Sequence, residues 1–267
     1  MVALISVGFA LLGLSVGSFL NLCSDRLPRG ESITSPGSRC DNCNRSLKAI
    51  DLVPVFSYLW LRGRCRYCDA RIPIRLPILE FATGVIFALL AWHYGLNLEL
   101  AIALIYASLL LLIFVVDLEQ GLILNVVVLP AVVLAFVFSF FWAGFKEFWP
   151  EVGPGFVVSS LLGGAIGFGL MMLPYLISRG GMGAGDVKLA ALIGLVSGFP
   201  LVLVALLVGI IAGGLVAAIL LISRLVRRKD AIPFGPFLVV GAMVSLIWGD
   251  NIIDWYQSSL TALASPL

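Results

Sequence analysis

The chain has 267 residues, of which 61% are hydrophobic and 12% are charged, and its mean hydropathy is +1.09. Soluble domains are closer to half apolar and a quarter charged, so a single water-soluble core would not bury this much apolar surface. The formal net charge of +2 is too small to suggest nucleic-acid binding. These figures exclude an ordinary soluble domain and predict an all-α protein that crosses a lipid bilayer several times.

Apolar segments of about 20 residues, the length that a helix needs to cross a bilayer core, follow one another along the chain. They occupy about 2–22, 76–95, 99–117, 122–142, 155–178 and 233–249. A longer apolar stretch, 187–224, is interrupted by Ser197-Gly198-Phe199-Pro200, which is typical of a tight hairpin and predicts two helices there. The sequence therefore predicts about eight transmembrane helices. Glycine pairs such as Gly163 with Gly167, and Gly209 with Gly213, are expected to let these helices pack closely.

The distribution of lysine and arginine predicts which side of the membrane each loop faces. With the N-terminus outside and eight alternating spans, the inner side receives residues 23–75, 118–121, 179–188 and 224–232. These segments hold 16 of the 17 basic residues and leave only Lys146 outside. Because basic loops stay in the cytoplasm, we predict that both termini lie outside and that the large loop is cytoplasmic.

Four of the five cysteines form two Cys-x-x-Cys pairs in this loop: Cys40 with Cys43, and Cys65 with Cys68. Two such pairs can place four thiolates around one metal ion. Zn²⁺ is the expected metal, although iron in a rubredoxin-like site uses the same ligands, and disulfides do not persist in the cytoplasm. Four protein ligands leave no position for water, so the metal is expected to stabilise the loop. Cys23, which has no partner nearby, is expected to be a small buried apolar residue.

Two aspartates stand out because a carboxylate at membrane depth is costly. Asp117 ends the apolar run 110–116, and Asp186 follows the glycine-rich segment 181–185 at the start of a predicted helix. In the alternating topology both lie at the cytoplasmic membrane boundary. The dipole at a helix N-terminus favours a carboxylate at position 186, and the preceding glycines permit positive φ angles and the close approach of a peptide.

Two carboxylates that share one site differ in proton affinity, so one is protonated while the other is ionised. This state suits peptide hydrolysis, because the ionised group takes a proton from water and the protonated group hydrogen-bonds to the scissile carbonyl. We therefore predict that Asp117 and Asp186 form a catalytic pair. Two alternatives stay open: a transporter whose aspartates relay protons or bind cations, and a zinc-bearing membrane scaffold without chemistry. The only histidine, His93, is predicted on the outer side, which argues against a Ser-His-Asp or Cys-His site.

Several motifs together resemble a known family. Gly183-Ala184-Gly185-Asp186 matches the Gly-x-Gly-Asp signature of type IV prepilin peptidases, which presenilin-type proteases share in shorter form. The other similar segments, in chain order, are Ser18-Phe19-Leu20-Asn21 with Arg26-Leu27-Pro28, the two cysteine pairs, Asp117-Leu118 before Ile123-Leu124-Asn125, and Ile232-Pro233-Phe234-Gly235-Pro236-Phe237. The resemblance covers essentially the whole chain.

The resemblance implies a bifunctional enzyme of the bacterial inner membrane. Such enzymes remove the basic leader of type IV prepilins or type II secretion pseudopilins at the cytoplasmic face, then methylate the new N-terminus with S-adenosylmethionine. The chain would divide into a first transmembrane helix (1–22), a metal-binding cytoplasmic loop (23–75) and a peptidase core with seven further helices (76–267). The residues carried over are Asp117 and Asp186 as the catalytic pair, Gly183, Gly185 and Lys188 in the active-site loop, and Cys40, Cys43, Cys65 and Cys68 as metal ligands.

Two positions depart from the family's pattern. Asp41 stands where many members have proline, which alters the turn of the first cysteine pair and not its ligands. Leu76 stands where members commonly have tyrosine, so the resemblance supports methyl transfer less strongly than cleavage. Glu80 is a weak candidate for the methyl-transfer site; alternatively it pairs with an arginine at the membrane surface.

Overall fold

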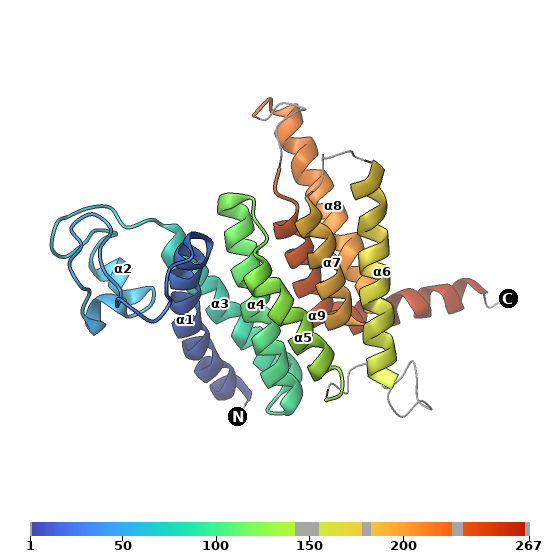
Figure 1. The fold of residues 1–267 in the computed structure, drawn as a ribbon. Coiled ribbons are helices and arrows are strands. Elements are labelled where there is room, and N and C mark those ends of the chain that lie inside the picture. Colours follow the sequence, from blue (N-terminus) through green and yellow to red (C-terminus); the bar gives the residue numbers. More distant parts are fainter. Residues whose placement is uncertain (1, 142–154, 178–182, 226–231, 265–267) are drawn as a thin grey trace. The chain divides into compact units, whose positions relative to one another are not determined.

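The computed structural model describes residues 2–141, 155–177, 183–225 and 232–264 (Figure 1). Five of the basic residues used above to predict topology, and two residues of the glycine-rich segment, lie outside this range: Lys146, Arg179, Gly181, Met182, Arg227, Arg228 and Lys229. The chain divides into two compact units, residues 1–112 and 113–267. Helices and the turns between them make up the described part of both units, which contains no named strand.

The first unit is built on two long helices with a polar loop between them. Helix α1 (Val2–Arg26) packs along α3 (Arg75–Tyr94). A Cβ at Gly13 would lie 2.7 Å from the carbonyl oxygen of Thr83, and one at Gly17 would lie 2.7 Å from Cα of Glu80. The absence of side chains at both glycines therefore lets the two backbones touch. The connecting loop carries two 3₁₀ turns, η1 (Leu27–Arg29) and η2 (Ala49–Leu52), and the short helix α2 (Phe56–Trp60).

The second unit is a helical bundle centred on α7. Helix α4 (Leu98–Gln120) begins in the first unit and ends in the second. It is followed by α5 (Asn125–Phe138), α6 (Gly155–Ile177), α7 (Ala184–Ser197), α8 (Leu201–Ile222) and α9 (Gly235–Ala264). Helix α7 contacts α5, α6, α8 and α9, and most of its residues are buried. Asp186, in the first turn of α7, is one of these buried residues.

The glycine pairs make close helix contacts, as predicted. A Cβ at Gly163 or Gly167 would collide with the backbone of α7 at Gly194 and Ala190. Along α8, a Cβ at Gly209 would lie 3.0 Å from the carbonyl oxygen of Phe237 in α9. Small residues thus let α7 approach α6, and α8 approach α9, at backbone distance.

The predicted hairpin between the two halves of the 187–224 stretch is also confirmed. Helix α7 ends at Ser197, Gly198 follows with φ of +72°, and α8 begins at Leu201. Ser159 of α6 holds this turn twice: its carbonyl accepts the N–H of Phe199 at 3.0 Å, and its hydroxyl donates to the Phe199 carbonyl at 2.8 Å.

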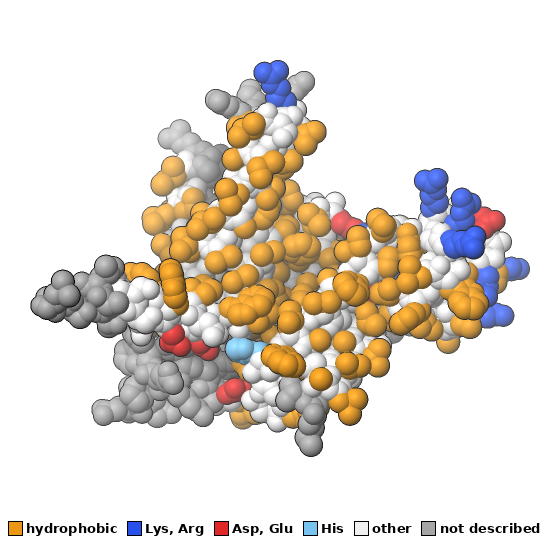
Figure 2. Space-filling model, turned by 180° about the vertical axis from the view of Figure 1, so that it is seen from behind, with side chains coloured by type: hydrophobic (Ala, Val, Ile, Leu, Met, Phe, Trp, Pro, Cys, Tyr) orange, Lys and Arg blue, Asp and Glu red, His pale blue; other side chains and the backbone are white. Residues whose placement is uncertain are grey.

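Eight apolar helices, α1 and α3 to α9, lie among the described residues at the predicted positions, which confirms an all-α membrane protein. Six of them are long and apolar enough to cross a bilayer, whereas α5 and α7 have only 14 residues each. Hydrophobic side chains cover the helical surfaces, and basic side chains gather on the loop between α1 and α3 (Figure 2). Cys23 is buried in α1, as expected.

Candidate functional site

The two cysteine pairs of the first unit have the same backbone geometry. In the first pair, the N–H of Cys40 donates to the carbonyl of Arg45 at 3.0 Å, and the N–H of Asn44 donates back to Cys40 at 2.8 Å. In the second pair, Cys65 donates to Ala70 at 2.8 Å and Asp69 donates back to Cys65 at 3.1 Å. Asn44 and Asp69 both have positive φ, near +55°, which asparagine and aspartate tolerate better than most residues. Each turn thus directs its two sulfurs to the same side.

These turns bring all four cysteines into one cluster. The four sulfur atoms lie within 4.8 Å of one another, and Cys40 Sγ is 3.8 Å from Cys68 Sγ. A zinc–sulfur bond of about 2.3 Å gives a sulfur–sulfur edge of about 3.8 Å in a regular tetrahedron. The cluster therefore fits a tetrahedral metal ion, and the four thiolates fill every position of such a site.

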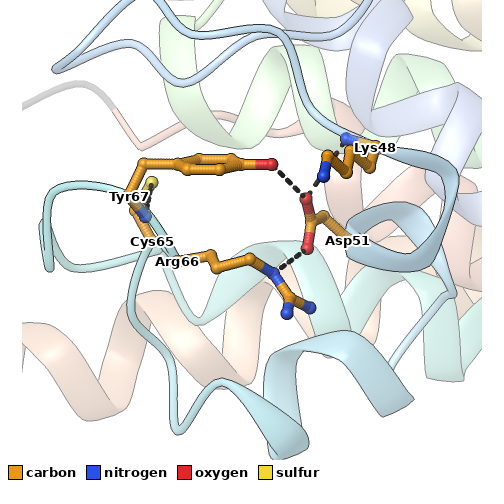
Figure 3. A network of polar contacts seen from close by, with 5 residues as sticks. All are labelled: Lys48, Asp51, Cys65, Arg66 and Tyr67. Atoms are coloured by element: carbon orange, nitrogen blue, oxygen red, sulfur yellow. Dashed lines mark hydrogen bonds and ion pairs between the residues drawn. The ribbon is translucent and has the colours of Figure 1, made fainter.

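A carboxylate network braces the second pair (Figure 3). Asp51, whose side chain is only 2% exposed, accepts hydrogen bonds from Arg66 Nε at 2.6 Å, from the backbone N–H of Lys48 at 3.1 Å and from the Tyr67 hydroxyl at 3.4 Å. Burial alone would raise the pKa of Asp51, but these hydrogen bonds outweigh it and lower the pKa below the ordinary value of 3.8. Because Arg66 and Tyr67 lie between Cys65 and Cys68, the ionised Asp51 fixes the turn that presents both sulfurs.

Glu80 connects this loop to the membrane helix α3. Its Oε2 accepts the backbone N–H of Val55 at 2.7 Å, and the Ser18 hydroxyl faces the same carboxylate. Val55, the residue before α2, has φ of +62°, a rare conformation for a β-branched residue. The partners of Glu80 found here are neutral, so the structure does not support the alternative in which Glu80 pairs with an arginine.

In the second unit, α4 and α7 bring the two predicted aspartates to one place. Asp117, near the end of α4, and Asp186, in the first turn of α7, are 4% and 8% exposed. The two carboxyl groups are close enough for their charges to interact. The backbone of Gly235 approaches the Asp117 carboxyl group, whereas Asp117 Oδ2 is buried and has no hydrogen-bond partner among the described residues. An unsatisfied buried oxygen of this kind is uncommon in native proteins.

Glycines near the two aspartates matter because they lack a side chain, and not because they adopt the positive φ angles that the sequence suggested. Gly183 has φ of −74° and Gly185 lies within helix α7, so neither adopts the positive φ that their residue type had suggested. Instead, a Cβ at Gly185 would lie 2.8 Å from Cβ of Ile123, and a Cβ at Gly235 would collide with Asp117 Oδ2. Ile123 thus sits against both glycines and closes one side of the carboxylate pair.

Lys188 does not contact the carboxylates in the described structure. Its Nζ donates to Oδ1 of Asn125 at 3.0 Å, which ties the first turn of α7 to the start of α5. Lys188 and Asn125 are both exposed. Ile123 and Asn125 had been noted only as part of a family motif, and Gly235 only as part of another; their contacts with α7 and Asp117 are tertiary and leave no local signal in the sequence.

Two family models match the sequence. The bacterial peptidase A24 N-terminal domain matches residues 11–94, and the type IV leader peptidase family matches residues 104–218. A protein from Bacillus subtilis named prepilin leader peptidase/N-methyltransferase is 31% identical over 250 residues, which cover 92% of this chain and 95% of the relative. The chain belongs to the type IV leader peptidase family. It is therefore a peptidase, and the predicted resemblance is confirmed.

Other members of this family align over nearly their whole length. The relative from Pseudomonas putida is 32% identical over 276 residues, covering 94% of this chain and 92% of its own. The relative from Pseudomonas aeruginosa is 29% identical over 276 residues, covering 92% and 91%. Both carry the same name as the Bacillus protein. No solved structure matches the chain.

Proposed function

We propose that this protein removes the leader of type IV prepilins or type II secretion pseudopilins at the cytoplasmic face of the bacterial inner membrane, with Asp117 and Asp186 as an aspartic catalytic pair. The observation that carries the proposal is that two buried carboxyl groups, from α4 and α7, lie near enough for their charges to interact in a member of a peptidase family. A transporter using the same aspartates is not favoured, because the family match is to peptidases.

The arrangement supports a shared-proton mechanism. Two interacting carboxyl groups at one site hold a single proton between them near neutral pH. The ionised member removes a proton from the attacking water, and the protonated member donates a hydrogen bond to the oxygen of the scissile carbonyl. The water oxygen bonds to the carbonyl carbon, and the resulting tetrahedral adduct breaks its carbon–nitrogen bond as a proton passes to the leaving amine. Asp117 Oδ2 has no hydrogen-bond partner in the described part of the chain, so it would accept a hydrogen bond from a water or substrate that enters the site.

The predicted topology supports a cytoplasmic active site. With the N-terminus outside, the end of α4 and the start of α7 both fall on the inner side, where nearly all basic residues are also predicted. A prepilin carries a short basic leader before an apolar helix, so the leader stays inside while the helix enters the lipid. The bond between them then lies at the depth proposed for the two aspartates.

The tetracysteine cluster is proposed to hold Zn²⁺ through Cys40, Cys43, Cys65 and Cys68. The matched backbone turns and the tetrahedral spacing of the sulfurs support this assignment. When bound, the metal supplies folding free energy to a loop that has little apolar core. It offers no open position for substrate, so leader cleavage is assigned to the aspartates alone.

The second proposed activity is methylation of the new N-terminus, as the names of the relatives suggest. When bound, S-adenosylmethionine would supply the methyl group, which would pass to the neutral α-amine to leave S-adenosylhomocysteine, and the amine would lose a proton to solvent. This activity would follow cleavage, because the amine is generated only when the leader leaves.

One experiment tests both activities: the purified protein is incubated with a prepilin and S-adenosylmethionine in detergent, and the product mass is measured. Asp117→Asn and Asp186→Asn should each reduce leader cleavage by about 10²–10⁴-fold, the usual contribution of a general acid or base. Asp254→Asn, a change at an exposed aspartate of α9, is the matched control and should cleave normally. Cleavage at the normal rate by either of the first two variants would reject the catalytic pair.

A further inference from the structure

The short helix α2 has two different sides. Ser57 and Tyr58 line the cavity that the loop encloses with the ends of α1 and α3. Phe56, Leu59 and Trp60 do not line it, and their exposed fractions are 62%, 65% and 84%. These three residues form the apolar face of α2. Single exposed apolar residues are ordinary on a protein surface, but three large ones on one helix of five residues indicate a face that binds another apolar surface.

The start of α2 is held at the level of the membrane helices. The N–H of Val55, the residue before α2, donates to Glu80 Oε2 at 2.7 Å, and the Ser18 hydroxyl faces the same carboxyl group. Glu80 is the sixth residue of α3, and Ser18 lies eight residues before the end of α1. At 1.5 Å per residue, these positions are about 8 Å and about 12 Å inside the helix ends. Both belong to helices that are long and apolar enough to cross a bilayer.

This attachment places α2 beside the helix pair. Figure 1 shows α2 to the side of the C-terminal half of α1, and not beyond its end. The Glu80 side chain reaches back a few ångström towards the start of α3, since side chains of a helix tilt towards its N-terminus. Helix α2 therefore begins at the surface of the bilayer rather than in the water above it.

Basic side chains follow the apolar face directly in the chain. Arg62 and Arg64 are exposed, and neither makes a side-chain hydrogen bond or ion pair among the described residues. Asp51, the acidic residue just before α2, is buried and already paired with Arg66, so it does not offset their charge. A face of aromatic residues and leucine next to unpaired arginines is typical of segments that lie in the membrane interface and contact anionic headgroups.

We infer that the apolar face of α2 inserts into the lipid leaflet beside the loop, which is the inner leaflet in the proposed topology, with Arg62 and Arg64 at anionic headgroups. Five residues alone would hold a soluble segment only weakly, but α1 and α3 already cross the bilayer and α2 starts at its surface. Lipid contact would keep the cysteine loop against the membrane instead of leaving it free in the cytoplasm. The inference goes beyond both proposed activities and uses only their topology.

The first test measures how close Trp60 lies to lipid chains. The full-length protein is placed in nanodiscs of phosphatidylcholine and phosphatidylglycerol, with or without bromine on the acyl chains. Tryptophan fluorescence is recorded for the wild type and for Trp60→Phe. Subtracting the two signals isolates Trp60, and phenylalanine preserves an apolar face. We expect bromolipid to remove most of the Trp60 signal, whereas iodide in the buffer should remove little of it.

The same subtraction with Trp92→Phe calibrates the measurement, because Trp92 is an exposed tryptophan of the membrane helix α3. Quenching of Trp60 by iodide and not by bromolipid would place the apolar face in water and overturn the inference. Protection of Trp60 from both quenchers would mean that protein covers the face, which also overturns it; light scattering would then show whether that protein is a second copy of the chain.

The second test concerns the arginines. Omitting phosphatidylglycerol should weaken bromolipid quenching of Trp60, because two arginines at an anionic surface favour the membrane-bound position by about 30-fold. In Arg62→Gln with Arg64→Gln, quenching should be equally weak in both lipids. Arg29→Gln with Arg39→Gln is the matched control: it also removes two charges, but these residues line the cavity of the loop, so dependence on anionic lipid should persist. Metal content equal to that of the wild type shows that each variant keeps the loop folded. Dependence on phosphatidylglycerol that persists in the first double variant would refute the role given to the two arginines.

Discussion

Replacing Gly235 with alanine tests the carboxylate pair without changing either aspartate. Gly235 is the first residue of α9 and is buried against Asp117. A Cβ at this position would collide with Asp117 Oδ2, and it would lie 3.1 Å from Asp117 Cγ and 3.3 Å from Cδ1 of Ile123. Ile123 also packs against Gly185, so a small movement of Ile123 alone would not make room for the added methyl group.

The size of the expected effect follows from this geometry. To restore ordinary contact, the Asp117 carboxyl group must move by about 1 Å, and a misplacement of that size costs about 10²-fold in rate. Alanine is favoured over glycine in helices by up to about 1 kcal/mol, so the substitution should not unfold α9 by itself. We therefore expect kcat for leader cleavage to fall about 10²-fold while the thermal unfolding temperature and metal content stay close to those of the wild type.

The assay is a time course of leader removal, followed by mass spectrometry, at saturating prepilin. Gly214→Ala is the matched control, since it is also a helical glycine and no atom lies within 4 Å of its added Cβ. If Gly235→Ala cleaves as fast as Gly214→Ala, then the position of the Asp117 carboxyl group does not matter for the reaction. The proposed shared-proton mechanism would then have to be abandoned.

Three further predictions concern the loop and the bundle. Asp51→Asn should release zinc to a chelator faster at neutral pH, by up to about tenfold, because the amide cannot form the ion pair with Arg66; zinc release is followed with a colorimetric chelator. Folding lowers the pKa of Asp51, so the stabilisation that its ionised form provides is fully present above pH of about 4 and is lost as the pH falls below 3.8. Unfolding of the loop, measured over a series of pH values, should therefore become easier as the pH falls through this range. Gly163→Ala should destabilise the bundle by about 1–3 kcal/mol, because the added Cβ would clash with Gly194. Gly169→Ala is the control, since its added Cβ meets no atom within 4 Å, and it should not destabilise the bundle. Thermal unfolding in detergent compares the two variants.

The sequence was sufficient to predict the helices and the cysteine cluster. Apolar runs of membrane length located the helices, and the Ser197-Gly198-Phe199-Pro200 segment located the turn between α7 and α8, because both signals are local. The spacing of Cys40, Cys43, Cys65 and Cys68 was enough to predict one cluster, since each Cys-x-x-Cys pair folds as an independent turn.

The surroundings of the aspartates were not predictable in the same way. The common depth of Asp117 and Asp186 followed from the predicted topology, but their neighbours come from other helices. Gly235 is more than 100 residues from Asp117 in the chain, and only the folded structure shows that a side chain at position 235 would collide with the Asp117 carboxyl group. Likewise, nothing local to Glu80 indicates that it accepts the N–H of Val55.

The shortness of α5 and α7 has a consequence for hydration. Each has 14 residues and is therefore about 21 Å long at 1.5 Å per residue, whereas the hydrocarbon region of a bilayer is about 30 Å thick. At least one end of such a helix must lie below the headgroups, and polar solvent then penetrates further along it than along a full-length span. Asp186, in the first turn of α7, then lies at a depth that water can reach without crossing an apolar barrier, and a hydrolase embedded in lipid requires this supply of its second substrate.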